Sequence, residues 1–285
     1  MRHFLGDRRG TVGAGMLCVL LIIAGGAPLI SAPPPAELDV VGTRFLPPLT
    51  TDRYGAFHAL GTDRFGRDVW SRLAYGARIS LAVSGLAVLI SAVLGVAVGA
   101  AAGYASGRLA LLLLGITDFV LALPRVVLLL LLASLWPPST ALVVLLLGGT
   151  GWMTIARLVH GEVRALAARP FVEGATALGA GTARVLWRHI LPNALTPVIV
   201  ASALGVGNAI MLEAGLSFLG LGVQAPTPSW GNMIASGRDT LVNAPWIATA
   251  PGLALVLAVV ACTLLGDALR DAYHGPQRGQ GRWAA

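Results

Sequence analysis

The chain has 285 residues, of which 56% are hydrophobic and only 12% are charged, and its mean hydropathy is +0.77. Soluble domains carry roughly 25% charged residues, so this chain has too little polar surface to cover itself. The composition excludes an ordinary cytosolic enzyme and a disordered protein. The two cysteines, Cys18 and Cys262, lie in apolar runs and form no CxxC motif, which argues against a secreted disulfide scaffold.

All twenty basic residues are arginine, and the sequence contains no lysine. A Walker A phosphate-binding loop requires its lysine, so the chain cannot carry one, and a lysine Schiff base is equally excluded. The net charge of +7 raises nucleic-acid binding as an alternative. Because no dense arginine cluster supports that alternative, we interpret the charge as membrane topology and expect no nucleic-acid partner.

Six apolar segments reach or approach the roughly 20 residues that a helix needs to cross the hydrocarbon core. In lipid the backbone must satisfy its hydrogen bonds within the segment, and the alternation of barrel strands is missing, so we expect helices. The predicted fold class is an all-α polytopic membrane protein with six transmembrane helices. The expected spans lie within 11–36, 79–102, 109–135, 139–156, 195–212 and 246–266.

A cleaved signal peptide is the alternative to a first transmembrane helix. The segment has a basic start, an apolar core and a small residue, Ala32, before a possible cleavage position. Residues 33–35 are all proline, which is a poor cleavage context, and the apolar run is long. We therefore favour a retained helix. The expected organisation is an N-terminal unit over 1–74, a five-helix permease-like domain over 75–271 and a flexible tail over 272–285.

Arginine counts favour an orientation with both termini in the cytoplasm. In that orientation the inner segments hold twelve arginines and the outer segments hold seven, with Arg125 inside a span. Six of the outer arginines lie in the long segment 31–78, where five acidic residues nearly neutralise them.

Two acid-first pairs precede the second span, Asp63 with Arg67 and Asp68 with Arg72, each four residues apart. On a helix this order stabilises by about 0.3 kcal/mol per pair. We interpret the segment as a solvated helix that packs on the outer mouth of the bundle. A contact surface for a binding protein is the alternative.

Three glycines in the second span, Gly95, Gly99 and Gly103, form a ridge of small residues four apart. Such ridges let membrane helices approach closely. We interpret the ridge as a helix-packing surface, either within the chain or against a partner subunit.

Charged side chains at membrane depth are functional candidates by default. Asp118 and Arg125 lie on one face of the third expected span, about 10 Å apart along its axis, so no direct pair is expected. Pro124, between them, is a candidate for a kink. Glu213 ends the fifth span, and we favour structural roles for all three charged residues. No histidine falls within a span, which leaves a Ser–His intramembrane protease without its base.

The longest inner loop, 157–192, has apolar residues at helix spacing in two groups, Val172, Ala175 and Leu178, then Val185, Leu186 and His189. Glu173 lies early in the first group, where negative charge suits the helix dipole, and Gly179 and Gly181 permit a bend. We expect a pair of short helices with an apolar face. From these residues alone, the face could rest on lipid headgroups or bind a partner.

The same loop resembles the EAA loop of ABC importer permeases, E-A-A-x3-G-x9-I-x-L-P. The corresponding residues are Glu173, Gly174, Ala175, Leu178, Gly179, His189, Leu191 and Pro192, of which Gly174 and His189 depart from the usual alanine and isoleucine. The HILPN form at 189–193 is similar to the dipeptide/oligopeptide/nickel subgroup.

Two further segments resemble that subgroup. Residues 60–81 match its motif before the second helix, and residues 213–239 match its motif after the fifth. In the first of these the motif residues are Gly61, Thr62, Asp63, Gly66, Arg67 and Asp68. The resemblance, which extends from about Leu60 to Asp271, is to the C-type subunit of the two paired permeases.

The resemblance implies a type I ABC importer permease fold in a prokaryotic cytoplasmic membrane. It implies a homologous permease as partner, two ABC ATPase subunits that hold ATP and magnesium, and an extracytoplasmic solute-binding protein. This chain would be no enzyme and would hold no cofactor. Residues 173–179 would form a coupling helix that sits in a groove on one ATPase, and the cargo would be a di- or oligopeptide, nickel or glutathione.

Two other classes of function stay open from the residues alone. A secondary carrier or channel usually places coupling acids near the bilayer midplane, and this chain offers only Asp118 and no visible internal repeat. An intramembrane enzyme would need an HExxH motif, a mid-span histidine or a spaced carboxylate pair, which the sequence lacks. The histidines are scattered, so no metal site is predicted.

Overall fold

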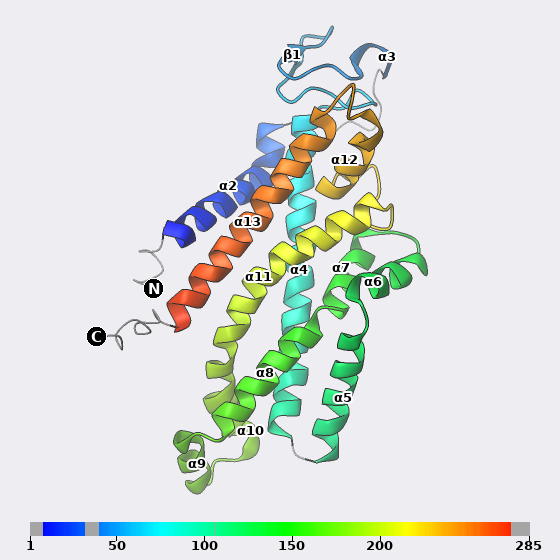
Figure 1. Ribbon diagram of the computed structural model, residues 1–285. Helices are drawn as coiled ribbons and strands as arrows, with labels where there is room; N and C mark the ends of the chain where they lie inside the picture. Colours follow the sequence, from blue (N-terminus) through cyan, green and yellow to red (C-terminus); the bar gives the residue numbers. More distant parts are fainter. Residues whose placement is uncertain (1–7, 32–39, 106, 275–285) are drawn as a thin grey trace, which may run out of the picture.

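The computed structural model describes residues 8–31, 40–105 and 107–274, and these residues are mostly helical (Figure 1). The central element is α4 (Val69–Tyr104), against which α2, α7, α8 and α11 pack. Two short regions extend from opposite ends of the bundle. The hairpin end contains α3 (Val40–Thr43) and the antiparallel strands β1 (Thr50–Thr51) and β2 (Phe57–His58), and the α9 end contains α9 (Pro170–Ala177) and α10 (Thr182–Val185).

Five helical segments of the described chain are long and apolar enough to cross a membrane, and a sixth crossing results if the bent pair α5 and α6 counts as one. The all-α polytopic class is therefore confirmed, with five or six spans. Besides α4, the segments are α2 (Arg8–Ile30), α7 (Thr140–Gly149) with α8 (Trp152–Ala167), α10 with α11 (Leu191–Phe218), and α13 (Trp246–His274).

The third expected span, 109–135, is not one helix. Instead α5 (Arg108–Ala122) and α6 (Arg125–Ser134) meet at an angle of 86°. Leu123 has an extended backbone, which is the preference of a residue before proline, and Pro124 has no N–H to continue the helix. The single helix predicted here is wrong, and the break lies at Pro124, the position expected for a kink.

Helix α4 begins ten residues before the expected start of the second span. Its first N–H groups are capped by Asp68, whose carboxylate accepts a hydrogen bond from the N–H of Ser71 at 2.7 Å. At 1.5 Å per residue, its 36 residues span about 54 Å, well beyond the ~30 Å hydrocarbon core. The helix therefore carries its first turns into the hairpin end.

The expected inner loop over 157–192 is mostly helical as well. Helix α8 continues to Ala167, and the π-helical turn Leu186–Ile190 joins α10 to α11. The loop that separates the two spans is consequently short. At the C-terminus, α13 includes residues 272–274 of the expected tail, and the remainder of that tail lies outside the described residues.

The glycine ridge of α4 faces α8. A Cβ atom added to Gly95 would lie 2.6 Å from Cβ of Ile155, and one added to Gly103 would lie 2.9 Å from Cβ of Val163. At Gly99 the added atom would meet the backbone of α8 at Ala156. The two helices therefore touch through backbone atoms, at a distance that only glycine allows.

We predict that Gly99→Ala lowers the stability of the folded chain by about 1–3 kcal/mol, because the added methyl group forces two backbones apart. Gly85→Ala is the matched control, since it lies on the same helix with nothing within 4 Å of its Cβ position. Thermal unfolding of the detergent-solubilised protein measures both changes. Equal melting temperatures for the two variants would contradict a tight α4–α8 contact.

Candidate functional site

Residues 61–68, expected as part of a helix, form a compact turn that seats the hairpin end on α13. Thr62 is fully buried, and its carbonyl accepts a hydrogen bond from the Trp246 indole N–H at 3.1 Å. Gly61 and Gly66 both have φ near +74°, a conformation that glycine adopts without strain. A Cβ at Gly61 would also lie only 2.8 Å from the Trp246 indole nitrogen.

Asp63 organises this turn from a buried position, with 2% of the residue exposed. Its Oδ1 accepts hydrogen bonds from the N–H groups of Phe65 and Arg67, and its Oδ2 accepts from Arg67 Nε at 2.8 Å. The buried guanidinium of Arg72 lies 3.7 Å from the same oxygen. The solvated helix predicted here is wrong, because an aspartate that bonds nearby backbone N–H groups stabilises a turn in place of a helix.

The second expected ion pair, between Asp68 and Arg72, does not form. Arg72 points to Asp63. Asp68 Oδ1 lies 2.8 Å from Nδ1 of His58, and the other oxygen caps α4. Asp68 therefore connects the hairpin to the start of the central helix.

The hairpin itself is held by Asp52. Its Oδ1 accepts hydrogen bonds from the N–H groups of Ala56 and Tyr54, and its Oδ2 lies 3.5 Å from Nε2 of His58. Chiefly the hydrogen bond from Ala56, and then those from Tyr54 and His58, lower the pKa of Asp52. This contribution to stability is present above the ordinary pKa of about 4 and is lost as the pH falls through the lowered pKa.

We predict that Asp63→Ala destabilises the hairpin end by about 3 kcal/mol, because it leaves the buried charge of Arg72 uncompensated. Asp239→Ala is the control, since Asp239 pairs with Arg238 on the surface and both side chains are more than half exposed. Removing such an exposed pair changes stability by less than about 1 kcal/mol. Limited proteolysis of residues 40–68 reports the difference, and equal cleavage rates would contradict the role of Asp63.

Glu213 is fully buried where α11 meets the loop that leads to α12 (Trp230–Gly237). Its two oxygens accept hydrogen bonds from the hydroxyls of Ser80 and Ser217, at 2.9 and 2.7 Å. Ser80 in turn accepts from the N–H of Trp230, and Ser217 accepts from that of Val223. This network ties α4, α11 and α12 together, which agrees with the structural role favoured for Glu213.

Asp118 and Arg125 are separated by the break between α5 and α6. Asp118 pairs with Arg157 of α8, whose Nη2 and Nε lie 2.6 and 2.8 Å from its Oδ1. The expectation that Asp118 and Arg125 share one face of one helix is wrong. The sequence did not predict Arg157 as the partner of Asp118, because Arg157 was expected to lie in an inner loop and not in a helix.

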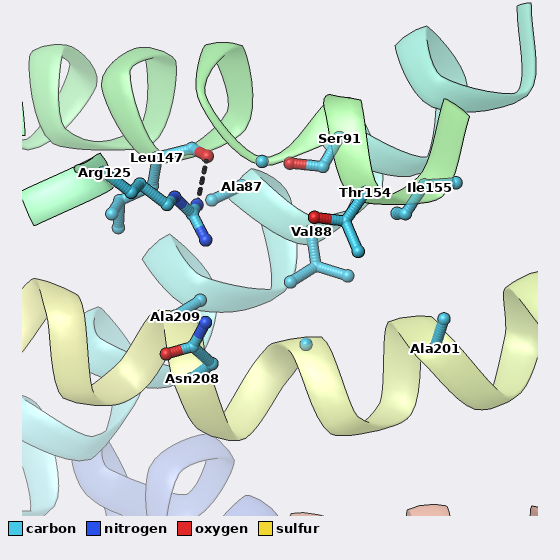
Figure 2. Close-up of a pocket in the computed structure, with 12 residues that line it drawn as sticks. Ala87, Val88, Ser91, Arg125, Leu147, Thr154, Ile155, Ala201, Asn208 and Ala209 are labelled. Atoms are coloured by element: carbon cyan, nitrogen blue, oxygen red, sulfur yellow. Dashed lines mark hydrogen bonds between the residues drawn. The ribbon is translucent and has the colours of Figure 1, made fainter. Parts of the chain in front are cut away.

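Arg125 lines a cavity of about 140 Å3 between α4, α6, α8 and α11 (Figure 2). Its Nη2 donates to the carbonyl of Leu147 at 3.0 Å, and its Nε lies 3.4 Å from the hydroxyl oxygen of Thr150. Figure 2 shows the amide of Asn208 and the guanidinium extending toward each other from facing helices. The other polar side chains that line the cavity are Ser91 and Thr154.

These polar lining residues were not identified from the sequence, apart from Arg125. The available signal was the position of Ser91 and Asn208 near the middle of long apolar helices. Within the described ranges, no group of three or more His, Cys, Asp and Glu side chains is placed to hold a metal ion.

The α9 end combines a buried face with an exposed one. Val172 of α9 is buried in a cluster with Val185 and Ile190, which also includes residues of α8 and α11. In the same segment, Leu178 is 92% exposed and Phe171 is 46% exposed. The short helix is therefore fixed to the bundle and presents apolar side chains outward.

Most residues of the EAA-like motif lie on or beside this exposed side. Glu173, Gly174 and Gly179 are exposed, and Gly179 has φ +82°, which ends α9 in a left-handed turn. Of the remaining motif residues, Pro192 is exposed, Ala175 and His189 are half-buried, and Leu191 is buried. The structure thus brings the first half of the motif to the surface and places Leu191 in the core.

Residues 95–275 match the family described as the binding-protein-dependent transport system inner membrane component. The chain belongs to this family. It is an ABC importer permease and a multi-pass membrane protein, as the motifs in 60–81, 157–192 and 213–239 imply.

Several relatives carry specific names. The chain is 36% identical over 266 residues to the dipeptide transport system permease protein DppC of Alkalihalophilus pseudofirmus, covering 93% of this chain and 85% of the relative. It is 38% identical over 268 residues to the di/tripeptide transport system permease protein DppC of Pseudomonas aeruginosa, covering 93% and 87%. It is 41% identical over 262 residues to the probable peptide ABC transporter permease protein y4tQ of Sinorhizobium fredii, covering 92% and 87%.

Proposed function

We propose that this permease forms half of the pore of an ATP-driven importer that carries di- or oligopeptides across the cytoplasmic membrane of a prokaryote. A homologous permease supplies the other half, two ABC ATPases bind ATP and magnesium, and an extracytoplasmic binding protein delivers the cargo. The names of the relatives support peptides over nickel or glutathione as cargo. The absence of lysine from the chain supports ATP binding in separate subunits.

The observation that carries the coupling proposal is the exposed apolar side of α9. An apolar side chain as exposed as Leu178 loses contact with water when it enters a groove on a partner, and this burial favours docking. The buried Val172 of α9 belongs to a core cluster with residues of α8 and α11, so we expect a displacement of α9 to be passed to these two helices. Both helices also line the Arg125 cavity. Movement of the ATPases can in this way reach the membrane interior.

The orientation that we propose places the α9 end in the cytoplasm, with both termini on that side. In this orientation the segments on the cytoplasmic side, including both terminal segments, hold twelve arginines and the outer segments hold seven. This difference agrees with the positive-inside rule. The hairpin end then faces the binding protein on the outside.

We predict that Gly179→Val reduces peptide uptake at least about tenfold, because a β-branched residue is strained by 1–2 kcal/mol or more at positive φ and distorts the exposed turn. Leu178→Glu has the same effect by placing a charge in the docking contact. Gly161→Ala is the control, since it lies on α8 with open space at its Cβ position. Unchanged uptake by both test variants, at normal amounts of protein in the membrane, would contradict the coupling role.

The energy source of uptake distinguishes the proposed importer from the alternative, an ATP-independent carrier or channel. We expect uptake of a labelled dipeptide to continue when the proton gradient is collapsed and to stop when ATP hydrolysis is blocked. Uptake that follows the proton gradient alone would contradict the importer proposal. Competition by unlabelled peptides, nickel and glutathione in the same assay identifies the cargo class.

A further inference from the structure

The cavity around Arg125 lies near mid-membrane. Val88 and Ser91 line it from close to the centre of the 36-residue helix α4, and Gly205 and Asn208 line it from close to the centre of the 28-residue helix α11. Helices of this length cross the membrane, so their central residues lie at the depth of the hydrocarbon core. A cationic side chain at that depth requires a compensating partner or a functional reason.

Arg125 has no carboxylate partner in the described part of the chain. The described ion pairs involve Asp52, Asp63, Asp68, Asp118 and Asp239, and Arg125 belongs to none of them. A guanidinium group has five N–H donors, and the described hydrogen bonds of Arg125 use only two of them. The remaining donors are available to an acceptor that enters the cavity.

The face on which the cavity opens is unsuited to lipid. Thr154 and Asn208 are both exposed on the isolated chain, and Arg125 is half-buried. Lipid tails cannot hydrogen-bond to a hydroxyl, an amide or a guanidinium, so these groups must border water, cargo or a second protein chain. This face therefore borders water, cargo or a second chain, and in the pore of the proposed function it borders the transport path.

We propose that the Arg125 cavity binds the free α-carboxylate of the transported peptide during its passage through the membrane. Two parallel N–H donors of arginine match the two oxygens of a carboxylate, and the Asn208 amide and the Thr154 hydroxyl are further donors at the same cavity. This inference rests on the proposed function, because it assigns a binding group to the cargo of that function.

The cavity on this chain has room for a carboxylate end and not for a whole peptide. Pockets that enclose complete small molecules measure roughly 300 Å3 or more, and this one measures about 140 Å3. The side chains of the peptide would then lie outside the cavity. Such a site recognises the C-terminal carboxylate that all these peptides share and does not discriminate between their side chains.

Cysteine protection tests this proposal directly. Ala201→Cys, at a lining position that supplies no donor, is introduced into a chain with Cys18→Ser and Cys262→Ala, and the full importer is placed in lipid nanodiscs. The modification rate by a small water-soluble thiol reagent is measured against increasing dialanine or dialanine amide. We expect dialanine to protect at concentrations at least about tenfold lower than the amide, the factor that one charge-assisted hydrogen bond supplies.

Three variants separate binding from a structural role of Arg125 in holding α6 to α7. Arg125→Gln removes the preference for the acid, Arg125→Lys retains part of it, and Arg157→Gln, which removes a cation outside the cavity, leaves it unchanged. A merely structural Arg125 would not produce a preference between acid and amide. Equal protection by the two peptides in the parent protein would overturn the proposal even if the Gln variant failed to assemble.

ATP-dependent uptake of dialanine by the same preparation distinguishes failure of the carboxylate site from failure of the proposed importer function. Uptake without a preference for the carboxylate in the cavity overturns this inference and leaves the proposed function standing. Failure of the parent importer to take up any peptide overturns the proposed function, and the carboxylate site is overturned with it.

Discussion

The close approach of α4 and α8 is the contact on which the remaining structure depends. Three glycines let the two backbones touch, and at the start of α8 Gly151 lies directly against the hydroxyl of Ser91. This contact fixes one wall of the Arg125 cavity, and the far end of α8 leads into α9. The internal cavity and the exposed α9 surface are therefore both connected to α8, which gives a physical basis for coupling them.

The apolar runs of the sequence predicted the helical class and the location of the spans, because long uncharged segments have few alternatives in lipid. The ends of the helices were harder to predict. Asp68 caps α4 well outside its apolar run, and Pro124 ends a helix within another run, since local hydrogen bonding decides both. The partners of Asp63 and Asp118 depend on tertiary contacts, so spacing along the chain predicted them only in part.

The two charged residues Glu213 and Arg125, both within the bundle, differ in whether their hydrogen bonds are completed inside the chain. Glu213 is enclosed and receives hydrogen bonds from two serine hydroxyls, so it strengthens the connection between helices. Arg125 keeps unused donors and faces a cavity whose lining includes the polar side chains of Thr154 and Asn208. A buried polar group whose hydrogen bonds are all made within the chain indicates a structural role, and one with unused donors indicates a ligand. The sequence alone could not distinguish Glu213 from Arg125 in this way, because each is a single charged residue beside an apolar run.

The central claim is that this permease works only as part of an assembly with separate ATPases. Purification of the tagged chain from its native membrane in mild detergent, followed by mass spectrometry, tests it most directly. The account predicts recovery of a second, homologous permease together with subunits that contain P-loops. Recovery of this chain alone, at a stable oligomeric mass, would contradict it.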